Sequence, residues 1–148
     1  MVTLVGRRHA GVGFHDGIAF GVRPTGAEAL MQTVILFAHG SRDPLWHLPM
    51  QAVQQRVTQM NPETPVACAY LELSQPDLPT AVAGLLSQGA THIRVVPMFL
   101  GVGKHVRHDL PEMMAELKEQ HPSVVFDCQP AVGEHPDLLD LLARIAVA

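Results

Sequence analysis

The sequence predicts an α/β protein with a flavodoxin-like fold: a doubly wound, four-stranded parallel sheet with helices on both faces. Short apolar runs rich in β-branched residues alternate with segments of helical spacing from residue 33 to the end of the chain. The runs are apolar throughout, which is typical of parallel strands buried on both faces. A chain of 148 residues is long enough for one core and too short for two ordinary domains. We therefore expect a single domain over 31–148.

Residues 1–30 differ from the rest of the chain. They hold six of the 12 glycines and show neither helical nor strand periodicity. We expect a poorly ordered N-terminal extension. Because the first apolar run begins just after Met31, we also expect the native chain to start there, and mass spectrometry of the native protein tests this by searching for peptides from 1–30.

Four apolar runs are the predicted strands, at 33–39, 65–73, 91–100 and 123–130. The helices between them are predicted from apolar spacing and from their end signals. Pro44 suits a first helical turn, and Asn61-Pro62 ends that helix. The next helix begins near Pro76 and runs to the stop at Gly89.

The third helix is predicted to begin at Asp109, because Asp109 and Glu112 have the spacing of a capping box. The fourth is predicted from Pro136 to Ile145. The resulting β-α units imply right-handed crossovers within one parallel sheet.

Composition argues against several partners. The formal net charge is −4 and no dense block of Lys and Arg occurs, so we expect no nucleic-acid partner. No apolar stretch approaches the ~20 residues that span a bilayer, so we expect no membrane partner. Cys68 and Cys128 lie in or beside apolar runs, which predicts buried, reduced thiols in a cytoplasmic protein.

The topology indicates where chemistry should occur. Ligands of open α/β sheets bind beyond the carboxyl ends of the strands. His39 ends the first predicted strand, Glu72 the second, and His105 lies in the loop after the third. Two imidazoles and a carboxylate on one edge predict a site for a borderline divalent metal such as cobalt, nickel, iron(II) or zinc. The alternative for any one of the nine histidines is a hydrogen-bonded surface side chain.

Cations gather at the same edge. Lys104 and Arg107 flank His105, and Arg42 follows the first strand, so these side chains could bind the carboxylates of an anionic substrate. The alternative is a solvated loop. His108 is interpreted as a bystander at the start of a helix.

Other enzyme chemistries fit less well. A histidine phosphatase would require arginine directly before the histidine, where this chain has Ala38. Ser41 lacks the G-x-S-x-G elbow of a serine nucleophile, and the first loop lacks G-x-G-x-x-G and P-loop patterns.

Three ordered motifs carry a family resemblance: FAHGSRDP (37–44), YLELSQPDLP (70–79) and VVPMFLGVGKHVRHDLP (95–111). With the later GEHP segment, they make the chain resemble the small sirohydrochlorin chelatases, short members of the class II chelatases, over essentially all of 33–145. The resemblance implies ATP-independent insertion of a divalent metal into sirohydrochlorin. The metal would be cobalt in cobalamin biosynthesis or iron in siroheme biosynthesis, and nickel in related members.

The resemblance also implies roles for single residues. His39 and His105 would bind the metal, which is a substrate, so no permanently bound cofactor is expected. Because metallation of such a ring must remove two pyrrole protons, Glu72 is the candidate catalytic base or else a third ligand, and His39 or His105 could share the proton transfer. Ser41, Arg42, Lys104 and Arg107 would contact the substrate's carboxylates.

Short family members resemble one half of the longer two-lobed chelatases and commonly form homodimers, so we expect a homodimer. The alternative function is a non-catalytic carrier that binds the metal or the tetrapyrrole. The sequence leaves open which metal and which pathway are physiological.

Overall fold

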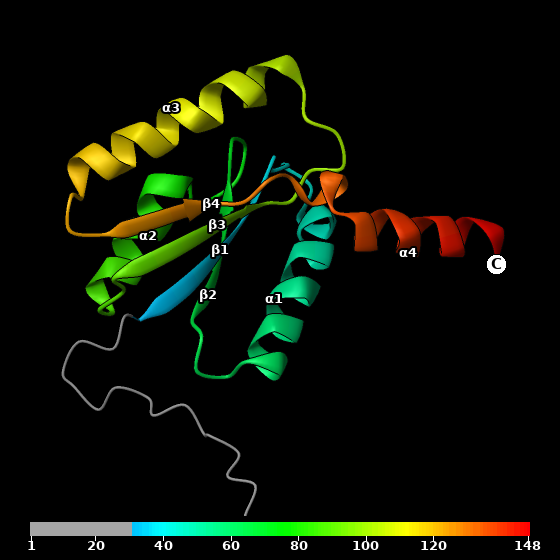
Figure 1. The fold of residues 1–148 in the computed structure, drawn as a ribbon, viewed down its shortest axis with the longest axis horizontal. Helices are drawn as coiled ribbons and strands as arrows, with labels where there is room; N and C mark the ends of the chain where they lie inside the picture. The colour runs from blue at the N-terminus through cyan, green and yellow to red at the C-terminus, as the bar shows by residue number, and fades with distance from the viewer. Residues whose placement is uncertain (1–30) are drawn as a thin grey trace, which may run out of the picture.

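The computed structural model describes residues 31–148, and the expectations for residues 1–30 lie outside this part of the chain. One sheet organises the described residues, and its strands are β1 (Gln32–Ala38), β2 (Val66–Tyr70), β3 (His92–Pro97) and β4 (Val125–Cys128). All pairs are parallel, in the order β2-β1-β3-β4 (Figure 1). The predicted four-stranded parallel α/β fold is confirmed.

Helical elements follow each strand. They are η1 (Pro44–His47), α1 (Leu48–Met60), α2 (Leu78–Ser87), α3 (Lys104–Gln120), η2 (Val132–Glu134) and α4 (Pro136–Val147). The helix α1 covers one face of the sheet, whereas α2 and α3 cover the other. The last helix, α4, projects away from the sheet instead of lying on it (Figure 1).

The alternation of β1 side chains divides the core into two layers. Ile35 and Phe37 point toward α2 and α3, where they pack with Val82, Ile93 and Val95, all of which are fully buried. The intervening residues of β1 point to the other face and pack with side chains of α1 and β2. That smaller layer contains Leu36, Ala38, Met50 and Tyr70.

The structure corrects the start of the third helix. α3 begins at Lys104, with Gly103 as its N-cap, so Asp109 does not cap it and Pro111 lies inside it. The apolar spacing explains the difference, because Val106 and Leu110 continue the core-facing stripe of Met114 backward by two turns. Consequently, His105 lies on the first turn of a helix and not in a loop.

The second to fourth predicted strands were too long. β2 ends at Tyr70 and β3 at Pro97, three residues before the predicted ends. Leu71 and Phe99 still pack against the core from the loops beyond, so their apolar character extended the predicted strands. Within residues 31–148, no helix is both long and apolar enough to cross a membrane.

Candidate metal site at the carboxyl edge of the sheet

β1 carries His39 to the carboxyl edge of the sheet. The side chain follows the alternation of Phe37 and so lies on the face that α3 covers. Its ring centroid is 4.5 Å from that of Phe99, which is buried and makes an edge-to-face contact with Phe37. His39 itself is exposed. Its imidazole therefore packs against the core through Phe99 and is still accessible to solvent, as a metal ligand must be.

Backbone pairing between β1 and β2 continues past the ends of both strands. The Leu71 N–H donates to the Ala38 carbonyl at 2.8 Å, and the Glu72 N–H donates to the His39 carbonyl at 3.0 Å. Gly40 lies in close contact with the segment that follows β2. Its φ is 95°, and a Cβ there would overlap the Glu72 carbonyl oxygen. The backbones that carry His39 and Glu72 are thus fixed side by side.

Ser74, which sequence reasoning did not single out, ties the two loops together. Its Oγ accepts the N–H of Ser41 at 2.9 Å and donates to the Ser41 carbonyl at 2.8 Å. The Nε2 of His47 lies 3.4 Å from the same Oγ and 3.3 Å from the Ser41 carbonyl oxygen, and its ring packs edge-on against Tyr70. The only signal in the sequence was a serine in a loop at the ligand edge.

Ser41 serves the loop as well as the edge. Its Oγ accepts the N–H of Asp43 at 3.1 Å, which leaves the hydroxyl hydrogen available to donate. Asp43 in turn caps η1 by accepting the Leu45 N–H. Ser41, which is predicted to contact the substrate, therefore belongs to a hydrogen-bonded turn.

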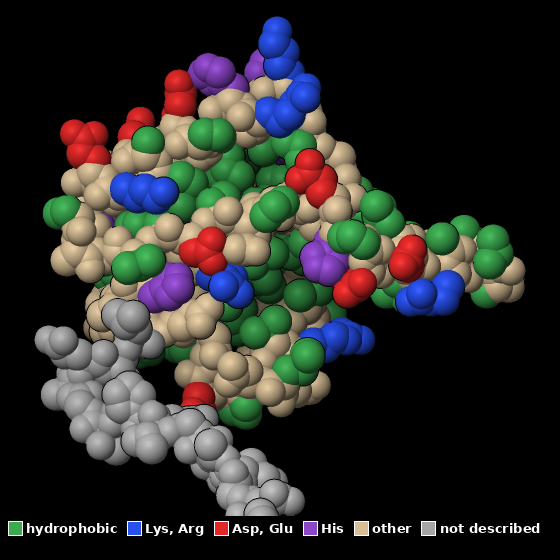
Figure 2. Space-filling view, in the orientation of Figure 1, with side chains coloured by type: hydrophobic (Ala, Val, Ile, Leu, Met, Phe, Trp, Pro, Cys, Tyr) green, Lys and Arg blue, Asp and Glu red, His purple; other side chains and the backbone are tan. Residues whose placement is uncertain are grey.

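The first turns of α3 present the remaining predicted residues. Val106 is buried and anchors the turn, whereas Lys104, His105 and Arg107 are exposed. Figure 2 shows Lys, Arg and His side chains gathered over this end of α3. Cations at a helix N-terminus oppose the helix dipole, so their placement does not serve helix stability. Together they make an electropositive edge suited to anions.

Arg42, Lys104 and Arg107 have no acidic partner within the described part of the chain. Among residues 31–148, the ion pairs join Arg94 with Asp127, and His108 with Asp109 and Glu112. Arg42, Lys104 and Arg107 are in none of them, so their charges remain available to a ligand.

The three predicted ligands, His39, Glu72 and His105, do not form a group whose ligating atoms all lie within 4.8 Å of one another. In residues 31–148, the only group of three ligating side chains within 4.8 Å of one another is His108, Asp109 and Glu112, all exposed on α3. The His108 Nδ1 lies 3.6 Å and 3.7 Å from the two carboxylates, which is ordinary surface pairing within a helix. Coordination by His39 and His105 therefore stays a prediction.

A cavity of about 460 Å³ opens between α3 and the sheet beside this edge. Its walls are largely apolar and include Phe99, Val102, Val106 and Leu110, and Arg107 supplies a cation. Phe99 thus contacts both the His39 ring and the cavity. An apolar ligand body with an acidic rim would fit such a surface.

The cysteines correct one expectation. Cys68 is only half-buried, and Cys128 is exposed at the end of β4, where it lines the cavity. The prediction that both are buried is wrong, because Cys68 and Cys128 lie on β2 and β4, the two edge strands of the sheet. Desolvation by the surrounding protein, and then the charge of Asp127, raise the pKa of the Cys128 thiol, which disfavours the thiolate that would bind a metal.

The fold and this edge define the class: a doubly wound α/β protein whose ligand edge carries accessible imidazoles and unpaired cations. Residues 33–147 match the family model described as CbiX, and the chain belongs to the CbiX family. This confirms the resemblance to the small class II chelatases.

Relatives of known name agree with this assignment. The chain is 33% identical over 91 residues to the sirohydrochlorin cobaltochelatase of Methanocaldococcus jannaschii, in a match that covers 62% of this chain and 64% of the relative. The crystal structure of a CbiX protein from Marinobacter aquaeolei VT8 is similar, with a TM-score of 0.69 and 31% identity, over 78% of this chain and 93% of that one.

A longer relative is also similar. SirB from Bacillus subtilis, solved with Fe3+, gives a TM-score of 0.64 at 28% identity, over 76% of this chain and 45% of SirB. The chain therefore spans slightly less than two thirds of the archaeal relative and under half of SirB.

Proposed function

We propose that this protein inserts a divalent metal, cobalt or iron with nickel as a third candidate, into sirohydrochlorin without ATP. One observation carries the proposal. His39 stands exposed on the buried Phe99 ring, on the face of the sheet that α3 covers, and His105 lies on the first turn of α3. The similarity to the archaeal protein named sirohydrochlorin cobaltochelatase supports the same reaction.

Metal transfer explains why few protein ligands would suffice. A metal held by His39 and His105 keeps coordination positions open, so the pyrrole nitrogens can replace the protein and water ligands one after another. Two pyrrole protons must leave as the metal enters, which requires a base near the ring. Glu72 is the proposed base or third ligand, since its backbone is fixed beside His39.

The acidic rim of the tetrapyrrole gives the cations a role. Arg42, Lys104 and Arg107 are exposed and outside the ion pairs of residues 31–148, and the Ser41 hydroxyl can donate a hydrogen bond. We assign these four residues to the carboxylates of the substrate. Part of the macrocycle would rest on the apolar wall that includes Phe99.

The proposal includes a homodimer as the acting unit, because the chain matches under half of SirB. It also places the reaction in the cytoplasm, which suits the two free cysteines.

Metallation kinetics test this function. Purified protein with sirohydrochlorin and Co²⁺ should shift the absorbance spectrum of the ring faster than the spontaneous reaction does. We expect His39→Ala and His105→Ala each to lower the rate at least about tenfold, since loss of metal-site groups has effects of about 10–100-fold. His121→Ala, at the far end of α3, is the matched control and should keep the rate.

Two outcomes would contradict the proposal in different ways. Equal rates for both variants and the unaltered protein would remove His39 and His105 as ligands. Tight binding of Co²⁺ or sirohydrochlorin without faster metallation would replace the enzyme by the alternative, a carrier.

A further inference from the structure

Two exposed leucines flank the strand that leads to His39. The strands β2 and β3 lie on either side of β1, and the loops that follow them contain Leu73 and Leu100. These side chains are 55% and 67% exposed, and they belong to neither layer of the core. Packing within the folded chain therefore does not explain why leucine occupies either position.

Leu73 also has an unfavourable backbone conformation. Its φ is 60°, in the left-handed region, and within residues 31–148 it is the only residue other than glycine with a positive φ. Glycine or asparagine would adopt this conformation at a lower cost. An exposed leucine held in this way lowers the stability of the free chain, which indicates that its side chain has another role.

The residues on both sides of Leu73 impose its conformation. Before it, the Glu72 N–H donates to the His39 carbonyl at 3.0 Å. After it, the Ser74 Oγ bonds to both the N–H and the carbonyl of Ser41. The chain must turn between these two anchored residues. Leu73 is consequently fixed beside Glu72, the proposed base.

Close backbone packing fixes Leu100 on the other side of β1. The Gly133 N–H donates to the Phe99 carbonyl at 2.9 Å, and a Cβ on Gly133 would overlap the Leu100 carbonyl oxygen. Phe99 contacts the His39 ring, and both Phe99 and Val102 line the cavity beside α3. Leu100 is thus an exposed apolar side chain on a fixed backbone, directly after the residue that packs against the proposed metal ligand.

We propose that Leu73 and Leu100 bind the apolar body of the tetrapyrrole and hold it beside His39. This inference rests on the proposed function and deepens it. The cations assigned above can bind only the carboxylates at the periphery of the ring, whereas the body of the ring requires an apolar surface. Leucines that follow the strands on both sides of β1 would keep the centre of the ring, where the metal must arrive, near the imidazole.

Binding of metal-free sirohydrochlorin tests this role without turnover. Trp46 is the only tryptophan of the chain and lies in η1, directly after the loop that follows β1, so its fluorescence should report binding. We expect the Kd of the double variant Leu73→Asn with Leu100→Asn to rise at least about tenfold, since two apolar contacts are lost. The rise should persist at high salt, which weakens the contacts of exposed cations with the carboxylates.

Metallation kinetics separate this inference from the proposed function. The leucine contacts are made whether or not the metal has entered, so the double variant should raise the KM for sirohydrochlorin and keep kcat, whereas His39→Ala should lower the rate at saturating ring. If the unaltered protein binds the ring without metallating it, the proposed enzyme fails, yet a higher Kd of the double variant still supports the leucine contacts.

Stability gives a readout that a purely structural role would move in the opposite direction. Because asparagine suits the left-handed region, Leu73→Asn should raise the urea midpoint of the free protein while it weakens ring binding. Leu100→Asn should leave that midpoint nearly unchanged, since Leu100 is exposed and has no positive φ.

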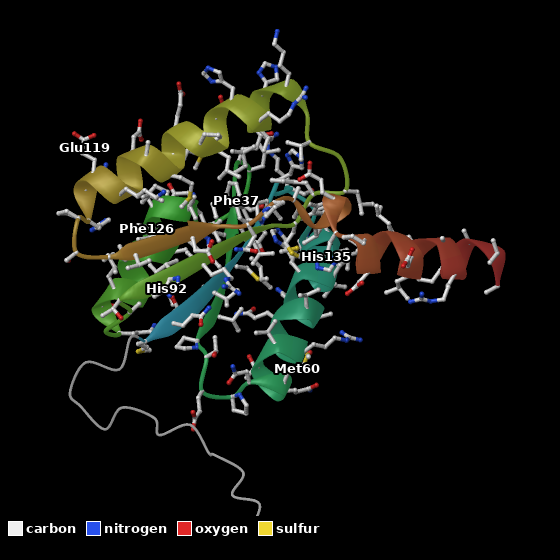
Figure 3. All side chains as sticks on the ribbon, in the orientation of Figure 1. Phe37, Met60, His92, Glu119, Phe126 and His135 are labelled. Carbon is white, nitrogen blue, oxygen red and sulfur yellow. The ribbon has the colours of Figure 1, made fainter. Side chains whose placement is uncertain are left out.

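Met60→Asn is the matched control. Met60 is 86% exposed and is labelled in Figure 3 at the far end of α1, away from Phe37 of β1, so this variant should keep the Kd for the ring. Equal Kd values for the double variant and the unaltered protein, failure of the unaltered protein to bind the ring, or a lower urea midpoint of Leu73→Asn would each overturn the proposal.

Discussion

Gly40 is tightly constrained at the carboxyl edge of the sheet. Its positive φ belongs to the left-handed region, which side chains with a Cβ adopt only at a cost, and its Cα faces the Glu72 carbonyl. The same contact keeps the backbone beside His39 close to β2. Gly40 has no side chain for catalysis, but its backbone contact thus fixes the position of His39, the proposed metal ligand.

We expect Gly40→Ala to lower the free energy of unfolding by about 1–3 kcal/mol or more, because the added Cβ is strained and also displaces the Glu72 carbonyl. Urea denaturation measures the loss, and the metallation rate should fall with it. Gly84→Ala in α2 is the control: a Cβ there meets nothing within 4 Å, so stability should rise by about 0.5–1 kcal/mol. Equal effects of the two substitutions would refute the constraint at Gly40.

Single residues also show how far the sequence could predict the site. His39 and Glu72 could be placed at one edge because parallel strands end at the same side of a sheet. Ser74 and His47 could not, since their hydrogen bonds to Ser41 depend on how two loops meet, and Ser74 and Ser41 are 33 positions apart. Local patterns carry no information on such contacts.

Among the elements, α2 has the clearest start. The Asp77 carboxylate accepts the Thr80 N–H at 2.9 Å, and Pro79 occupies the first turn, so the helix starts at Leu78, close to the predicted start near Pro76. The hydrogen bonds from Thr80 lower the pKa of Asp77, so the folded protein favours the charged cap. Capping therefore contributes stability that depends on pH.

We expect Asp77→Ala to cost about 0.5–2 kcal/mol of stability at neutral pH, as other cap removals do. Because the folded pKa lies below the ordinary value of 3.8, the charged cap contributes fully above that value and loses its effect as pH falls below it. Urea denaturation at pH 7 and pH 3 measures both. Asp77→Asn keeps a cap and should lose much less at pH 7, and a cost of Asp77→Ala that is larger at pH 3 than at pH 7 would contradict the assignment.

α3 shows why element boundaries were harder to predict than elements. The Asp109 capping box was a valid local signal, yet burial of Val106 stabilises an earlier start. Tertiary packing overrode the local preference and moved His105 onto a helix, where its direction is set more firmly than in a loop.

The two faces of the sheet are covered unequally. The layer under α2 and α3 is closed and contains the fully buried Val95, whereas the adjacent Val96 lies on the opposite face of the sheet and is only half-buried. The fold class was predictable because the strand and helix periodicities were strong. The departure of α4 was not, because amphipathic spacing predicts a helix but not the surface that it covers.

The two neighbouring valines provide a matched test of this asymmetry. In dilute protein, Val95→Ala should lower the free energy of unfolding by about 2 kcal/mol, since it removes two buried methyl groups and leaves a cavity. Val96→Ala should cost less than about 1 kcal/mol, since Val96 is only half-buried. Chemical denaturation measures both, and equal costs would show that the two faces are equally closed.

The Phe99 side chain connects the proposed metal ligand His39 with the cavity beside α3. Its ring contacts that of His39, and Phe99 also forms part of the cavity wall. Anything that displaces this ring to enter the cavity also moves the platform of the imidazole. The occupancy of the cavity and the orientation of His39 are therefore connected through one side chain, so a ligand in the cavity changes how a ligand at His39 is held, and the reverse holds equally.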